Sequence, residues 1–62
     1  MKLYVRWGSI AKMDELYRSR EFLRAVLSPN TGNTYNIETD DREKLRELKR
    51  VLDSNNIKYA IK

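Results

Sequence analysis

FLRAVLSPNTGNTYNIET, residues 22–39, is the stretch that decides the fold. Its centre is a cluster of turn-forming residues, in which Pro29 fits the first central position of a turn and Gly32 a left-handed one. An alternating, β-like run follows at residues 34–39, so the pattern favours a hairpin whose first strand is residues 22–27. The same six residues contain Leu, Arg and Ala, which are good helix formers, so one helix over residues 10–27 is the alternative.

The segment before this stretch predicts a strand followed by a helix. Residues 2–7 alternate in character, and the pattern places Trp7 on one side with Leu3 and Val5, and Tyr4 on the other side with Arg6. Gly8 and Ser9 then end the strand, and Ser9 is placed to cap a helix that begins at residue 10.

The segment after it predicts a second helix and a last strand. Asp40 is placed as a helix cap with Glu43 three residues on, and apolar residues at helical spacing continue to about residue 54. Asn55 and Asn56 tolerate the geometry that ends a helix, and residues 57–62 alternate as a strand.

The predicted order is therefore β-α-β-β-α-β in a single domain spanning residues 1–62. This order is typical of an α+β fold, a small two-layer sandwich of the ferredoxin-like βαββαβ type, with two helices on one face of a four-stranded antiparallel sheet. With residues 10–27 as one helix, a three-stranded βαβαβ layer results instead. Both arrangements leave one face of the sheet uncovered.

The composition excludes most catalytic and metal chemistry. The 62 residues contain 13 Lys and Arg, nine Asp and Glu, a net charge of +4, and neither Cys nor His. Without those two residue types there is no disulfide, no thiolate zinc site and no ordinary general base, so we expect no enzyme, no metal and no cofactor. No apolar run approaches the roughly 18 residues of a membrane span, so we expect no membrane association and a cytoplasmic location.

A basic surface that contains aromatic residues is the candidate binding site. Residues 1–31 hold six basic and three acidic side chains, and the hairpin would bring aromatic and arginine side chains to the uncovered face of the sheet. Arginine binds phosphates and carboxylates in bidentate fashion, and aromatic rings stack on bases or anchor interfaces. The residues expected to bind are Tyr4, Arg6, Arg18, Arg20, Phe22 and Arg24.

A second basic face is expected on the helix of the last third. Its members recur at helical spacing and are Arg42, Arg46, Lys49 and Arg50. Acidic residues three or four positions away offset much of this charge, which is typical of a solvated helix surface.

These features favour a non-catalytic binding protein whose partner is an acidic macromolecule. We expect a protein partner, such as a nucleic-acid-handling complex that this chain regulates or inhibits, and a viral or mobile-element origin fits so short a chain. The alternative is direct nucleic-acid binding, with arginines contacting phosphates. A homodimer could form through the open sheet face or through the edge strand at residues 57–62.

Overall fold

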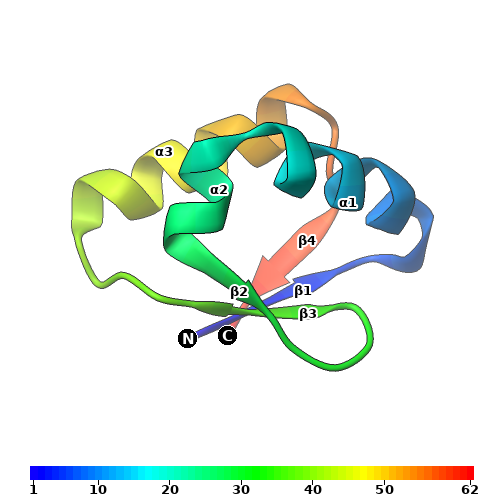
Figure 1. The fold of residues 1–62 in the computed structure, drawn as a ribbon, viewed down its shortest axis with the longest axis horizontal. Coiled ribbons are helices and arrows are strands. Elements are labelled where there is room, and N and C mark those ends of the chain that lie inside the picture. The colour runs from blue at the N-terminus through cyan, green and yellow to red at the C-terminus, as the bar shows by residue number, and fades with distance from the viewer.

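Four antiparallel strands form one sheet, and three helices lie together on one side of it (Figure 1). This computed structural model describes all of residues 1–62, and its architecture is a small α+β arrangement in two layers. In chain order the elements are β1 (Lys2–Val5), the 3₁₀ turn η1 (Trp7–Ser9), α1 (Ile10–Ser19), α2 (Glu21–Val26), β2 (Leu27–Pro29), β3 (Thr34–Ile37), α3 (Arg42–Ser54) and β4 (Tyr59–Ile61).

The strand order across the sheet is β2-β3-β1-β4, which makes β2 and β4 the two edges. Leu3 at the centre lies opposite Tyr35 on β3 and Ile61 on β4. Since cross-strand partners share a face and successive residues alternate, this row faces the helices. Tyr4 and its partners therefore lie on the face that no helix covers.

The core lies between the sheet and the helices. Leu3 and Val5 enter it from β1. Each α-helix contributes at least two buried side chains, which lie on the side of the helix that faces the sheet. The complete cluster consists of Leu3, Val5, Met13, Leu16, Leu23, Val26, Leu27, Leu48, Val51, Leu52 and Ile57. All of them are aliphatic or Met, so burial of apolar surface holds the two layers together.

Residues 22–27 do not form the strand that their sequence predicts. The hairpin is confirmed, but its first strand is only Leu27–Pro29, and a strand over residues 22–27 is wrong. Leu23 and Val26 are buried three positions apart, which is a helical spacing that a strand cannot bury on one face. Residues 21–26 accordingly form α2, and because a fourth strand exists, the three-stranded alternative is wrong as well.

The single helix over residues 10–27 is also wrong, because the chain breaks between α1 and α2 at Arg20. Arg20 has extended backbone angles, φ −112° and ψ 114°. The guanidinium of Arg24 donates to the carbonyl oxygens of Tyr17 (3.1 Å) and Arg18 at the end of α1. Those carbonyls lack helical partners at a helix end, so Arg24 stabilises the break.

Trp7 and Ser9 depart from their predicted roles. Strand β1 ends at Val5, and Trp7 begins the 3₁₀ turn with 75% of its surface exposed instead of facing the helices. The buried Oγ of Ser9 makes no capping bond to α1 but accepts the backbone N–H of Lys58 at 2.9 Å. Ser9 therefore ties the start of α1 to the chain entering β4.

The predicted helix of the last third is confirmed as α3. The cap is Asp41 rather than Asp40, and its carboxylate accepts the backbone N–H of Glu43 at 2.9 Å. Asn56 takes the expected left-handed conformation (φ 59°) where the helix ends. None of the helices combines the length and the apolar character needed to cross a bilayer.

Candidate functional site

The uncovered face of the sheet, which we call the open face, carries polar and basic side chains on all four strands. Register places Tyr4 of β1 between Thr34 of β3 and Ala60 of β4. The next row contains Lys2 opposite Asn36, and Asn36 is opposite Ser28. The open face thus consists of Lys2, Tyr4, Arg6, Ser28, Thr34, Asn36, Ala60 and Lys62.

Tyr4 lies at the centre of the open face. Its exposed fraction is 38%, whereas Leu3 and Val5 on either side of it in the chain are buried. The Nζ of Lys62 is 5.9 Å from the centroid of the Tyr4 ring, at the outer limit of a cation–π contact. An aromatic ring that packs against no helix and has a small neighbour, Ala60, is available for stacking.

Three cations surround Tyr4 without acidic partners. Lys2, Arg6 and Lys62 are exposed, and none of them has a carboxylate within 4.0 Å. One carboxylate reaches this face, at the β2 edge, where Oε1 of Glu38 accepts the hydroxyl of Ser28 at 2.5 Å. The side of the open face formed by β1 and β4 is therefore positively charged.

Trp7 extends the aromatic surface at one end of the open face. A shallow hollow of about 440 Å³ lies between Tyr4, Trp7 and Ala60, and Arg6 and Asn33 also line it. The amide of Asn33 donates to the carbonyl of Val5, which fixes the β2–β3 loop beside β1. The hollow thus combines two aromatic side chains, one guanidinium and one amide.

The predicted binding residues do not form one surface. Tyr4 and Arg6 lie on the open face, whereas the remaining four lie in the helical layer, on α1, on α2 or between them. They are separated because residues 22–27, expected to extend the sheet, instead form most of α2. The four residues of the helical layer are Arg18, Arg20, Phe22 and Arg24.

Several of the helical residues already have structural roles. Arg18 pairs with Asp14 one turn earlier on α1, at 3.3 Å between Nη2 and Oδ2. Arg24 is bonded to the end of α1, as described above. Phe22 is half-buried against the core. Of the four, Arg20 alone is an exposed cation whose side chain makes no hydrogen bond or ion pair with another residue.

The basic face of α3 is exposed but mixed with acids. Arg46 and Arg50 share a shallow hollow with Glu43 and Glu47, and Arg50 is paired with Glu47. Arg42 and Lys49 are exposed on the same helix. Glu43 and Glu47 offset the charges of Arg46 and Arg50, whereas Arg42 and Lys49 have no carboxylate within 4.0 Å.

Lys2, Lys62 and the exposed position of Trp7 were missed from sequence. Alternation with buried Leu3 indicates that Lys2 shares the face of Tyr4. Lys62 shares that face only because β4 pairs with β1, which the sequence does not reveal. For Trp7 the signal is Gly8, which marks the end of the strand before the alternation can reach residue 7.

Two tyrosines on the covered side of the sheet have raised pKa values. Burial, reinforced by Asp14, raises the pKa of Tyr35 above its usual 10.0. Burial also raises the pKa of Tyr59, with the neighbouring carboxylate of Asp53 adding to the effect. Both hydroxyls stay protonated at neutral pH, so neither adds charge to the site.

No known protein family matches this chain, and neither a curated protein nor a solved structure matches it.

Proposed function

We propose that this protein binds single-stranded nucleic acid on the open face of its sheet. Lys2, Arg6 and Lys62 contact phosphates, and a base stacks on the ring of Tyr4. Trp7 offers a second stacking surface at the end of β1. The protein acts by binding, without catalysis.

The observation that carries this proposal is the exposed ring of Tyr4, set among three unpaired cations on a bare sheet. Proteins that bind single strands combine a basic surface for the backbone with aromatic rings on which bases stack. Base stacking needs an exposed ring face, and a duplex keeps its base faces inside the helix. The combination of Tyr4 and Trp7 with cations thus favours single strands over duplex.

The sequence alone favours a protein partner for the basic surface. The arrangement of charges in the structure favours nucleic acid instead. Four arginines support that expectation, Arg6, Arg18, Arg20 and Arg24. Arg18 and Arg24 are bonded within the helical layer, whereas Arg20 is exposed there without an ion pair and Arg6 lies on the open face. The cations on the open face are Lys2, Arg6 and Lys62, and they accompany an aromatic ring. Phosphate charges and base rings together complement such a surface better than carboxylates do.

We further propose that the architecture is of the ferredoxin-like type. The element order and the sheet order β2-β3-β1-β4 support this assignment. The departure is the first crossover, in which two helices, α1 and α2, replace one. In such an arrangement all the helices cover one face, which leaves the other available to a ligand.

The proposal is tested by fluorescence anisotropy with a labelled 12-nucleotide single strand of mixed sequence, in RNA and DNA forms, between 50 and 200 mM KCl. Three phosphate contacts predict a slope of log K against log salt of about −2, since each contact to a single strand contributes about −0.7. The fluorescence of Trp7, the one tryptophan of the chain, reports binding independently.

Two controls define the outcome. The corresponding duplex must bind more weakly than the single strand, and excess polyglutamate must compete poorly, because it supplies charge without bases. No binding at 50 mM KCl contradicts the proposal. Equal binding of single strand, duplex and polyglutamate also contradicts it, because the site would then recognise negative charge alone.

A further inference from the structure

The two edges of the sheet differ in how much free backbone they present. At the β2 edge the outward-facing residues are Leu27 and Pro29. The N–H of Leu27 bonds to Leu23 at the end of α2, and its carbonyl accepts the hydroxyl of Tyr17 at 3.4 Å. Pro29 has no N–H to donate. The β2 edge is therefore closed to another strand.

The β4 edge is open. Backbone hydrogen bonds join Lys62 to Lys2 in both directions, and Lys58 accepts the N–H of Arg6. In an antiparallel ladder the residues between such pairs point their N–H and C=O groups away from the partner strand. Tyr59 and Ile61 therefore direct theirs outward, where no other strand lies.

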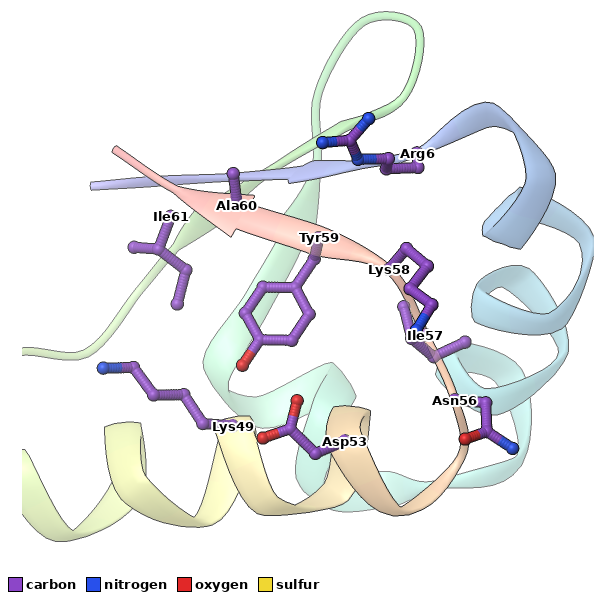
Figure 2. A pocket seen from close by; sticks show the side chains of 9 residues that line it. All are labelled: Arg6, Lys49, Asp53, Asn56, Ile57, Lys58, Tyr59, Ala60 and Ile61. Carbon is purple, nitrogen blue, oxygen red and sulfur yellow. The ribbon is translucent and has the colours of Figure 1, made fainter.

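A groove accompanies this free edge. A hollow of about 640 Å³ lies between β4 and α3. Figure 2 shows Tyr59 pointing from the strand toward the helix. Lys49 and Asp53 line its helical side, and Arg6 and Lys58 lie toward the end of the strand nearest the 3₁₀ turn. With three cations against one carboxylate, the groove is electropositive.

We propose that the β4 edge takes an extended acidic peptide of a partner protein as a fifth, antiparallel strand. Main-chain bonds to Tyr59 and Ile61 supply affinity, and side chains at alternate positions supply specificity, as in other strand additions. Residues of the peptide opposite Lys58 and Lys62 are acidic. Residues opposite Tyr59 and Ile61 are apolar and share their face, toward α3. The motif is acid–apolar–any–apolar–acid.

The charges of Lys58 and Lys62 favour an acidic peptide at the β4 edge over a second copy of the chain. Two β4 strands pairing about Ala60 would place Lys58 of one copy opposite Lys62 of the other, twice. Like charges directly opposite in a ladder are destabilising, and edge lysines are a common protection against self-pairing. The same two lysines attract a peptide with carboxylates at those positions.

The inference shares Lys62 with the nucleic-acid proposal, but it rests on the free backbone of the β4 edge and has its own test. The probe is a fluorescein-labelled ten-residue peptide centred on Glu-Val-Thr-Val-Glu, titrated with the protein, beside a matched peptide centred on Lys-Val-Thr-Val-Lys. We expect the acidic peptide to bind at least about tenfold more tightly, because two opposed charge pairs change sign. The double variant Lys58→Glu with Lys62→Glu should reverse this preference.

N-methylation of the peptide backbone separates strand addition from simple charge attraction. Methylating both Val nitrogens removes the donors that face β4 and should weaken binding at least about tenfold. Methylating the Thr nitrogen, which faces away, should leave binding unchanged. In the labelled protein, amide hydrogen exchange at Tyr59 and Ile61 should be fast when free and slow with the acidic peptide.

Three results overturn the inference. The first is no preference between the acidic and basic peptides. The second is binding that is insensitive to methylation of the Val nitrogens, which would indicate attraction without a fifth strand. The third is slow exchange of Tyr59 and Ile61 in the free protein together with a dimer in solution, which would show that a second copy occupies the edge.

Discussion

The two faces of the sheet are built from alternating residues of the same strands, yet their physical character is opposite. On β1, Leu3 and Val5 are buried against the helices, while Tyr4 between them is exposed among cations. Because successive side chains of a strand point to opposite faces, four residues supply both surfaces. Stability and the proposed binding are therefore separable by substitutions one residue apart.

A similar contrast separates the open face from the outer surface of the helices. Both carry several cations. On the helices, Arg18 and Arg50 pair with carboxylates, Arg24 bonds to backbone carbonyls, and Arg46 lies beside Glu43 and Glu47, although Arg42 and Lys49 are unpaired. Lys2 and Lys62 have no such partner. The number of basic residues on a surface thus says less about binding than whether their charges are already satisfied.

The largest expected effect comes from the covered face. Leu3→Ala should lower the free energy of unfolding by about 2–5 kcal/mol, because it leaves a cavity in a fully buried site. Tyr4→Val, one residue away, should lower it by well under that amount, since Val is a good strand former and the site is exposed. Urea unfolding followed by circular dichroism measures both. Equal losses would erase the distinction between the two faces.

The next effect sharpens the contrast between the open face and the helices. Replacing Lys2 and Lys62 by Ala should weaken single-strand binding about 25-fold at 0.1 M salt and reduce the salt slope by about 1.4, because two phosphate contacts are lost. The matched control replaces Arg42 and Arg46 of α3, which should change affinity little. The same loss in both double variants would mean that net charge alone drives binding.

A smaller effect is expected in the helical layer. Arg24→Ala removes the donor to the carbonyls that end α1 and should cost about 1 kcal/mol of stability, the size of an ordinary protein hydrogen bond. It should leave nucleic-acid affinity unchanged. Arg20→Ala, an exposed neighbour, is the control and should alter neither quantity. If the Arg24 variant is as well folded as the parent protein but binds nucleic acid more weakly, the helical layer is part of the binding site.

The smallest effect concerns alkaline pH. The pKa of Tyr35 is raised in the folded protein, so the fold holds this proton more tightly than the unfolded chain does. The stability gained from this protonated hydroxyl is fully present below about pH 10 and is lost as pH rises through the raised pKa of Tyr35. Tyr35→Phe should therefore lose less stability than the parent protein between pH 9 and 11 in urea unfolding. Identical pH profiles would contradict this origin.

Much of the fold could be predicted from sequence because its signals are local. The period of two in β1 and the apolar face of α3 each identified an element and the side it buries. The stretch at residues 22–27 could not be resolved, because its choice between helix and strand depends on long-range packing. Leu23 and Val26 of α2 reach the core only once the Arg20 break redirects the chain.

The candidate site was predicted in part for the same reason. Tyr4 and Arg6 follow from the alternation of one strand, and they lie where expected. Lys62 joins them only through the pairing of β4 with β1, which links residues nearly a chain length apart. Phe22 was assigned to the open face by assuming a strand, so its error follows from the error in the fold.

The most direct test of the central claim is the affinity of Tyr4 variants for the 12-nucleotide single strand. Tyr4→Val should weaken binding by about 1–3 kcal/mol, or about 5- to 150-fold, the contribution of one stacked base. Tyr4→Phe, which keeps the ring, should bind like the parent protein, and both variants should remain folded. If Tyr4→Val binds as tightly as Tyr4→Phe, no base stacks on the open face and the proposed function is wrong.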